Sequence, residues 1–258
     1  MNLELDAKTI VITGGTDGLG FALAQRLVAE GASVAICSRS LERVARAAEE
    51  LAGAGGSVLA EVCDVSDASH LERFAASVLE RFGQVDGLVN NAGHAAAQQI
   101  DHVSDEQWQA DLDLKLFAAI RTTRLFTPAL AVSGGAILNV LAISGKHPGA
   151  SSSPTAISRA AGLAFTKAAS KDLGPRGIRV NAILIGFVAS GQWRRAAELQ
   201  GLSADELEHQ LVSAMGIPLG RMGRAEEFAD LGAFLLSPLA GYLSGVGINL
   251  DGGLSSVV

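Results

Sequence analysis

The chain has few of the residues that build a disulfide framework, a metal centre or a membrane span. It contains only two cysteines, Cys37 and Cys63, in 258 residues. Both fall in or beside predicted strands, where buried free thiols are expected rather than a disulfide or metal site. No apolar stretch reaches the length of a transmembrane helix, and the N-terminus lacks a signal-peptide pattern. We therefore expect a cytoplasmic protein with no membrane partner and no bound metal.

Basic residues are also scarce. Lysine and arginine total 20 against 27 acidic residues, which gives a net charge of −7. This balance argues against nucleic acid as a partner, because phosphate backbones are bound by excess positive charge. Hydrophobic residues make up 48% of the chain and glycine contributes 30 residues. This length and composition fit one α/β domain over residues 1–258, with tight turns between its elements.

Strand-like and helix-like segments alternate along the chain. This alternation predicts a doubly wound parallel sheet of about seven strands with right-handed crossovers. The predicted strands cover residues 10–12, 33–38, 57–62, 87–89, 136–140, 178–184 and 246–250. The predicted helices cover residues 21–28, 41–51, 67–82, 104–130, 154–173 and 226–236, and a polar helical segment lies at 191–215.

A glycine-rich turn, Thr13 to Gly20, lies between the first predicted strand and helix. Such a turn directs backbone N–H groups and the positive end of a helix dipole toward one point, which suits a phosphate. Gly14 can adopt the tight-turn backbone, and Gly18 and Gly20 leave space for close approach. The alternative is an ordinary tight turn between a strand and a helix.

Several further segments accompany this turn. Its spacing is T-G-x-x-x-G-x-G, Asp64 and Val65 form a D-V pair, and Asn90 to Gly93 read N-N-A-G. Together with a D-G-G segment ending at Gly253, they resemble the short-chain dehydrogenase/reductase family over residues 8–253. The resemblance implies a Rossmann fold, an NAD(P)-dependent oxidoreductase acting on a small carbonyl or alcohol, and a homotetramer built on two long crossover helices.

The end of the second predicted strand indicates which cofactor is bound. In the family an acidic residue there selects NAD, and a nearby basic residue accepts the 2′-phosphate of NADP. Ser38 and Arg39 stand at that point, and the guanidinium fork of arginine matches phosphate geometry. Asp17 opposes this assignment, because its charge would repel the 2′-phosphate. We therefore favour NADP(H), with NAD(H) possible.

The resemblance assigns cofactor contacts to sixteen positions. They are Gly14, Thr16, Asp17, Gly18, Leu19, Gly20, Ser38, Arg39, Asp64, Val65, Asn91, Ala92, Gly93, Arg159, Gly186 and Val188.

The four catalytic positions of the family are all changed. The family uses an asparagine, a serine, a tyrosine and a lysine, and the matching positions here are Lys115, Ala142, Thr155 and Arg159. The chain has one tyrosine, Tyr242, and it lies in a structural turn of the family pattern. An aliphatic hydroxyl is far less acidic than a phenol, so Thr155 alone cannot replace the tyrosine.

Two other groups are candidates for the missing acid. Lys115, if desolvated, could act as a general acid, and His147 has a pKa suited to proton transfer. The alternative for His147 is an exposed loop histidine. Residues 187–217 match the family's substrate lid, and within them Gln192 to Arg195 could cover an anionic substrate or form a solvated face or subunit contact.

Two functions therefore remain open. The first is an oxidoreductase with a rebuilt acid/base set. The second is a non-catalytic cofactor-binding protein, acting as a sensor or as the partner of an active subunit. The altered catalytic positions favour the second, and family membership favours the first.

Overall fold

The computed structural model describes residues 2–189, 197, 199 and 201–258. Its centre is a parallel sheet with strand order β3-β2-β1-β4-β5-β6-β7. The strands are β1 (Thr9–Thr13), β2 (Ser33–Ser38), β3 (Val58–Val62), β4 (Gly87–Asn90), β5 (Ala136–Ala142), β6 (Arg179–Ile185) and β7 (Gly247–Leu250). This is the doubly wound sheet that the sequence predicts. The order reverses between β1 and β4, and open α/β sheets bind ligands beside such a point.

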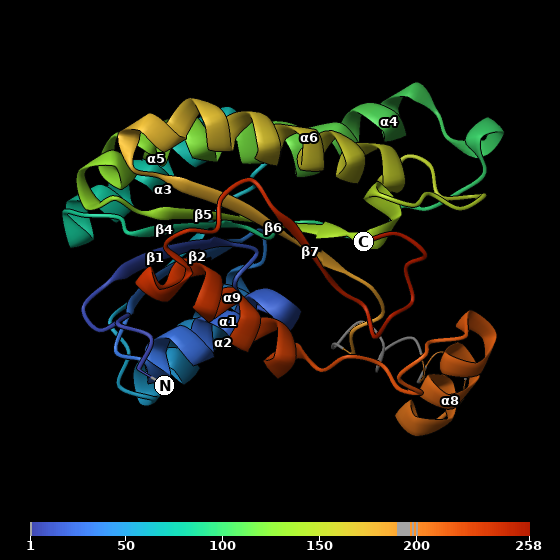
Figure 1. Ribbon diagram of the computed structural model, residues 1–258. Coiled ribbons are helices and arrows are strands. Elements are labelled where there is room, and N and C mark those ends of the chain that lie inside the picture. The colour runs from blue at the N-terminus through green and yellow to red at the C-terminus, as the bar shows by residue number, and fades with distance from the viewer. Residues whose placement is uncertain (1, 190–196, 198, 200) are drawn as a thin grey trace.

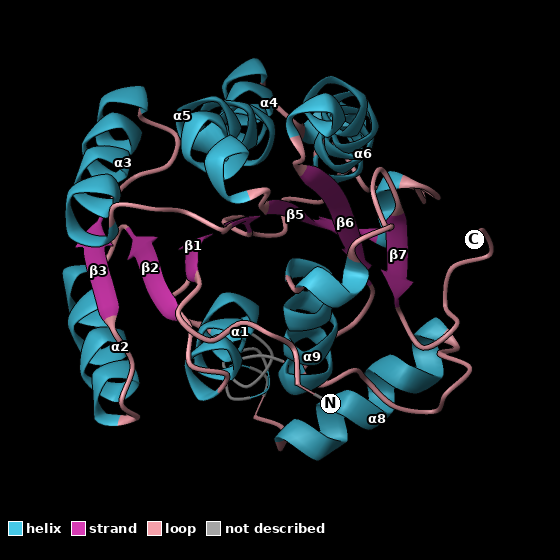
Figure 2. Ribbon diagram, turned by 60° about the vertical axis from the view of Figure 1, so that its left-hand side comes forward, coloured by secondary structure: helices cyan, strands magenta, loops and turns pink. Residues whose placement is uncertain are grey.

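Helices cover both faces of the sheet (Figure 1, Figure 2). One face carries α3 (Ala68–Phe82), α4 (Asp105–Leu112), α5 (Ala118–Ser133) and α6 (Thr155–Leu173). The other carries α1 (Gly18–Ala29), α2 (Leu41–Gly53) and α9 (Ala225–Leu236). The central strands are largely apolar because both faces are buried, as in other parallel sheets.

The helix starts follow local capping chemistry. Asp67 accepts hydrogen bonds from the backbone N–H groups of Ser69 and His70, and so caps α3 as expected. Ser104 and Gln107 form the predicted capping box at the start of α4. The helix predicted at 104–130 is not continuous, however. A π-helical turn, η2 (Asp113–Phe117), separates α4 from α5.

A buried polar network ties the centre of the sheet to α5 and α6. The Asn90 side chain accepts from Thr122 at 2.6 Å and donates to Asn139 at 2.8 Å. Asn139 in turn donates to Thr166 at 2.9 Å. Each buried amide is thus hydrogen-bonded within the protein, which fixes two strands and two helices together.

Beyond β6, the helix α8 (Ala204–Met215) projects from the body (Figure 1). Gln192 to Arg195, the sequence's candidate substrate cover, lie outside the described residues. Within the part of the chain that the structure describes, we find no helix that combines the length and the hydrophobicity of a membrane span. Cys37 and Cys63 are buried free thiols, as expected.

Candidate active site

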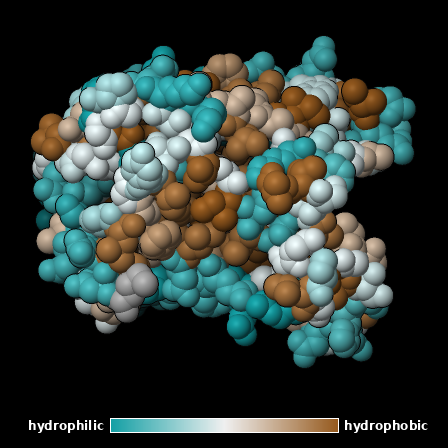
Figure 3. Space-filling view, in the orientation of Figure 1, coloured by the Kyte–Doolittle hydropathy of each residue, from teal (hydrophilic) through white to brown (hydrophobic). Residues whose placement is uncertain are grey.

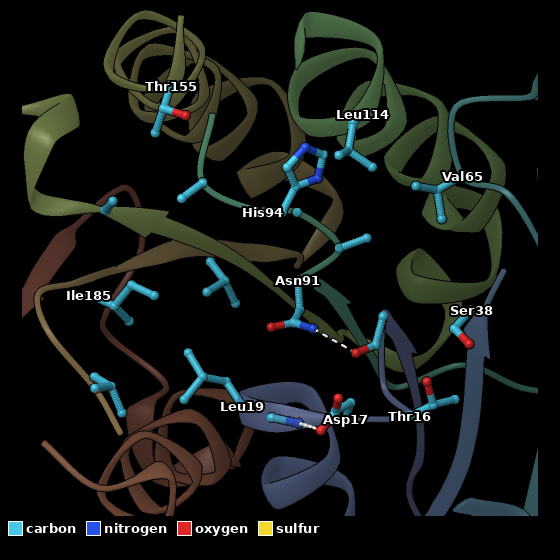
Figure 4. A pocket seen from close by; sticks show the side chains of 18 of the residues that line it. Thr16, Asp17, Leu19, Ser38, Val65, Asn91, His94, Leu114, Thr155 and Ile185 are labelled. Carbon is cyan, nitrogen blue, oxygen red and sulfur yellow. Dashed lines mark hydrogen bonds between the residues drawn. The ribbon is translucent and has the colours of Figure 1, made fainter. Parts of the chain in front are cut away.

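A pocket of about 620 Å³ lies at the carboxyl ends of the strands. Figure 3 shows the molecule hollowed on the side where α8 projects, and Figure 4 shows the pocket from close by. Most of the sixteen positions assigned to the cofactor line it, from Gly14 on β1's loop to Val188 after β6. The exception is Gly20, which does not line the pocket.

Gly20 has a packing role instead. A Cβ atom built on Gly20 would lie 2.4 Å from Nδ2 of Asn91 and 2.5 Å from the carbonyl oxygen of Gly14. The Asn91 amide donates to the carbonyl oxygens of Thr13 and Gly14, both at 3.0 Å (Figure 4). Gly14 has a φ of +66°, in the left-handed region that favours glycine. These contacts hold the glycine turn against β4.

The N-terminus of α1 differs from a simple anion site. Asp17 caps the helix, and its Oδ1 accepts from the backbone N–H of Gly18 at 2.8 Å (Figure 4). The sequence predicts that backbone N–H groups of this turn face a phosphate. The carboxylate engages one of the N–H groups at this helix N-terminus.

The far end of the pocket carries two cations and an unpartnered hydroxyl. Arg39 and Arg43 line this end beside Ser38. The Ser38 Oγ atom is buried and has no hydrogen-bond partner among the described residues. Asp64 also lines the pocket, with one carboxylate oxygen accepting from the Ser66 N–H at 3.0 Å. Arg43 is absent from the sequence prediction, although its position four residues after Arg39 on a helix start could have indicated it.

Arg159 extends from α6 into the opposite half of the pocket. One of its terminal nitrogens donates to the carbonyl oxygen of Val140 at 2.7 Å. Its Nε atom is buried and unpartnered within the described part of the chain. Burial lowers the pKa of Arg159 to about 10, so the guanidinium is still charged at neutral pH. A buried unpaired donor of this kind is costly unless a ligand satisfies it.

Lys115 lies beneath the pocket and not on its wall. Its side chain is 1% exposed and forms an ion pair with the Asp111 carboxylate. Its Nζ atom also donates to Thr155 Oγ1, at 3.0 Å. Thr155 lines the pocket, and so connects the buried ammonium with the interior of the site. The π-helical turn places Lys115 there, and such turns are frequent at functional sites.

The Thr155 hydroxyl is held in one orientation. Its Oγ1 atom accepts from Lys115 Nζ and from the backbone N–H of Ala96, the latter at 2.9 Å. A hydroxyl has two acceptor lone pairs and one donor proton. With both lone pairs occupied, the proton is left to donate, and no hydrogen bond to a described residue uses it. Thr155 therefore offers a hydrogen-bond donor to a ligand in the pocket.

His147 is not in the pocket. It is exposed, and its ring lies 3.1 Å from the hydroxyl of Ser256 near the C-terminus. Its neighbour Lys146 donates to the Gly247 carbonyl and the Asn249 side chain, at 2.9 and 2.8 Å. The short helical turn after β5 carries both side chains away from the pocket and toward β7, which explains the difference from the expectation.

His94 is the histidine that lines the pocket (Figure 4). It follows Gly93 directly, and its position beside the N-N-A-G motif is the signal that could have identified it. Burial and the nearby charge of Lys115 lower the pKa of His94. Ala142 also lines the pocket and brings no polar side-chain atom to it.

The residues fit a dinucleotide. Among the described residues, three buried side-chain atoms have no hydrogen-bond partner, and two of them, Ser38 Oγ and Arg159 Nε, belong to residues that line this pocket. The glycine turn lies between them, where a pyrophosphate would pass. Ser38, Arg39 and Arg43 could hold a phosphorylated ribose, and Arg159 could bind the hydroxyls of the second ribose.

Comparison with known proteins agrees with this geometry. Residues 14–255 match a family model described as enoyl-(acyl carrier protein) reductase. The chain is 32% identical to the 3-oxoacyl-[acyl-carrier-protein] reductase of Chlamydia muridarum, covering 99% of this chain and 100% of that protein.

Two solved structures are similar over almost their whole length. One is an NADPH-bound short-chain oxidoreductase from Pseudomonas aeruginosa PAO1 that contains an atypical catalytic center. It is 36% identical, with a TM-score of 0.93 and coverage of 98% of this chain and 99% of that one. The other is L-sorbose reductase from Gluconobacter frateurii complexed with NADPH and L-sorbose. It is 31% identical, with a TM-score of 0.94 and full coverage of both chains.

Proposed function

Because the chain belongs to the short-chain dehydrogenase/reductase family, we propose that it is an NADP(H)-dependent oxidoreductase that reduces the carbonyl group of a small molecule through a non-standard proton donor. The observation that carries this proposal is the Thr155 hydroxyl, which faces the pocket with both lone pairs occupied by Lys115 and Ala96. A hydroxyl fixed in this way is a ready donor to a carbonyl oxygen.

The cofactor assignment rests on the cations at the adenosine end. Ser38, Arg39 and Arg43 can meet a 2′-phosphate, and the strand end carries no carboxylate that would select NAD. The two similar structures described above bind NADPH. NADP(H) is therefore the favoured cofactor.

The protein's residues supply the proton of the reaction. When bound, NADPH supplies a hydride from its nicotinamide to the carbonyl carbon. As the carbonyl oxygen gains the electron pair of the C=O bond, it takes the Thr155 proton, and Thr155 takes a proton from the Lys115 ammonium. The product is an alcohol, and the neutral Lys115 amine recovers its proton from solvent. Lys115 is thus the acid, and Thr155 transmits its proton.

The substrate side of the site supports a small molecule with anionic character. Lys115 and Arg159 bring two positive charges against one negative charge, that of Asp111. The resemblance implies a lid at residues 187–217, part of which lies outside the described residues. Ala142 offers no donor to the developing oxyanion, and one such donor is worth about 10²–10³-fold in rate. We expect simple ketones and 3-oxoacyl compounds to be reduced well below the rates usual in the family.

The test is NADPH oxidation against a panel of small carbonyl compounds, with and without carboxylate groups. Thr155→Val removes the hydroxyl but keeps the side-chain shape, and should lower kcat by about 10²-fold. Thr155→Ser keeps the hydroxyl and is the matched control, for which we expect most of the activity to remain. Equal rates for the valine variant and the wild type would exclude Thr155 from the reaction.

A second candidate is a non-catalytic NADP(H)-binding protein. The observation in its favour is Ala142, which leaves the site without a side-chain donor where the family has a serine. Tight NADPH binding with no oxidation by any member of the panel would support it.

A further inference from the structure

A buried carboxylate lies behind the proposed proton donor. Asp111 is 3% exposed, on the last turn of α4. One of its oxygens forms the ion pair with Lys115 Nζ. The other accepts from the Ser158 hydroxyl at 2.6 Å. Both carboxylate oxygens are therefore engaged, and the group is fixed by partners on η2 and α6.

Lys115 depends on this carboxylate for its charge. A lysine side chain that is 1% exposed has lost nearly all its hydration, which disfavours the ammonium form. Burial accordingly lowers the pKa of Lys115, the Asp111 hydrogen bond raises it in opposition, and the charge of Arg159 lowers it again. Asp111 is the only carboxylate among these influences.

The ion pair also determines where the ammonium lies. Lys115 Nζ is held between Asp111 on α4 and Thr155 Oγ1 on α6. Without the first contact, the flexible lysine chain has no fixed position under Thr155. A displacement of about 1 Å in a proton donor can cost 10²-fold in rate.

We propose that Asp111 is a positioning residue for carbonyl reduction, which holds the Lys115 ammonium against the Thr155 hydroxyl and keeps it protonated. This inference rests on the proposed function and deepens it. Asp111 does not line the pocket, so it acts through Lys115 and contacts neither substrate nor cofactor. The sequence places Asp111 and Lys115 four residues apart on a helix, a spacing that also occurs in solvated surface pairs.

The charged groups facing Lys115 come from three elements. Asp111 lies on α4, Arg159 on α6, and His94 on the loop after β4. Arg159, with a pKa of about 10, is a fixed charge at neutral pH. His94 is the other group that could titrate near neutrality, so its contribution must be separated from that of Lys115.

The experiment is the pH dependence of kcat/KM for Asp111→Asn, measured in both directions with NADPH plus carbonyl and NADP⁺ plus alcohol. Reduction needs protonated Lys115, so its rate falls as pH rises through the lysine pKa, and the pH profile has an alkaline limb there. Removing Asp111 should move this limb to lower pH by at least about one unit. The rate of reduction on the alkaline side should then fall about tenfold. Oxidation needs the neutral amine, so its limb should move to lower pH as well, and its rate near that limb should rise.

A slower reduction together with a faster oxidation distinguishes the loss of a positioning residue from general damage to the site. A merely structural role would lower both rates and leave both limbs in place, and that result would overturn the proposal. Asp113→Asn is the matched control, because Asp113 is two residues away and faces Arg121 on a more exposed side. The control should leave both limbs unchanged. Repeating the profiles in a His94→Gln background removes the histidine as a source of the shift.

Two further variants keep the outcome decisive. If the asparagine variant does not fold, Asp111→Glu retains the charge but displaces it. It should then lower kcat at least about tenfold without raising the KM for substrate, and an unchanged kcat would contradict the proposal. The Lys115→Met variant distinguishes failure of the proposed function from failure of the role proposed for Asp111. If its kcat and limb match the wild type, the proposed function fails. If it loses the limb while Asp111→Asn keeps it, only the role of Asp111 fails.

Discussion

At the residue scale, we expect three side chains at the proposed adenosine end of the pocket to determine the choice of cofactor. The buried Ser38 hydroxyl has no hydrogen-bond partner within the part of the chain that the structure describes, and Arg39 and Arg43 add two positive charges beside it. Asp17 stands nearby on the glycine turn, but its carboxylate is engaged in capping α1. One Asp17 carboxylate oxygen accepts this capping bond. The carboxylate that the sequence analysis expects to repel the 2′-phosphate is thus held at the start of α1.

Arg39→Ala should therefore weaken NADPH binding more than NADH binding. A hydrogen bond to a charged group contributes about 1.5–3 kcal/mol, so we expect NADPH affinity to fall by about tenfold to a hundredfold and NADH affinity to change little. Titration of nicotinamide fluorescence measures both. Arg46→Ala is the matched control, since Arg46 pairs with Glu50 on the same helix and does not line the pocket. Equal losses for both cofactors would remove Arg39 from the 2′-phosphate site.

Single residues were predicted unevenly. The motif positions are predictable because each follows a strand end, and parallel strands bring their carboxyl ends to one edge. Asp111 was not, because an aspartate and a lysine four residues apart give the same sequence pattern whether they are buried or solvated. His147, in contrast, was a candidate from the sequence but does not line the pocket. Its short distance from the fifth strand does not indicate which way the following turn directs its side chain.

At the scale of elements, the departure from prediction lies in the long crossover. Residues 104–130 have the periodicity of one helix, and the structure divides them at η2 (Asp113–Phe117). The turn contains neither proline nor glycine, so the usual signals of a helix break are missing. The turn includes Lys115, whose side chain donates to Thr155, so we expect its consequence to be functional.

The N-terminus of α9 gives a pH-dependent prediction for stability. Glu227 binds Arg221 through both carboxylate oxygens, at 2.9 and 2.6 Å, and accepts from the Arg224 N–H at 2.8 Å. These bonds lower the pKa of Glu227 to about 2, from 4.5. A carboxyl group whose pKa is lower in the folded state stabilises the fold at pH values above its pKa in the unfolded state. This stabilisation is lost as pH falls through its pKa in the folded state.

Glu227→Gln should accordingly lower the melting temperature at pH 7 by roughly 1–3 °C, a small effect because the pair is partly exposed. The difference from the wild type should shrink as pH falls from about 5 to about 2. Thermal unfolding followed by circular dichroism across this range measures it. A difference that stays constant with pH would mean that the carboxylate charge is not its cause.

At the scale of the whole molecule, two surfaces of the described structure expose small or apolar side chains. Exposed small residues follow one face of α6, at Ala160, Ala164 and Ala168, with Ile157 on the preceding turn 44% exposed. Figure 3 shows apolar side chains gathered over the region of α9 and β7. Small-residue helix faces allow close helix packing between copies of a chain.

We expect a homotetramer in which α5 and α6 of each subunit take part in a four-helix contact. Ala164→Glu places a charge in the middle of the α6 face and should dissociate the tetramer to a smaller species. Ala45→Glu makes the same change on an exposed position of α2 and is the matched control. Light scattering at micromolar concentration reports the mass, and a monomeric wild type would rule out the assembly.

The overall architecture was the most predictable level. Seven alternating strand and helix patterns determine a parallel sheet because crossover connections are right-handed and short. The structure agrees with each predicted strand to within about two residues at each end. The position of the expected lid was less predictable, since polar helical segments such as residues 191–215 carry no pattern that fixes their place against the body.

The central claim is that Lys115 supplies the proton for carbonyl reduction. The most direct measurement is a single turnover, in which protein with bound NADPH is mixed with a carbonyl substrate and NADPH fluorescence is followed. We predict that the wild type oxidises its NADPH with formation of one equivalent of alcohol. Lys115→Met should bind NADPH equally well and react at least about 10²-fold more slowly. Equal single-turnover rates for the two proteins would contradict the account.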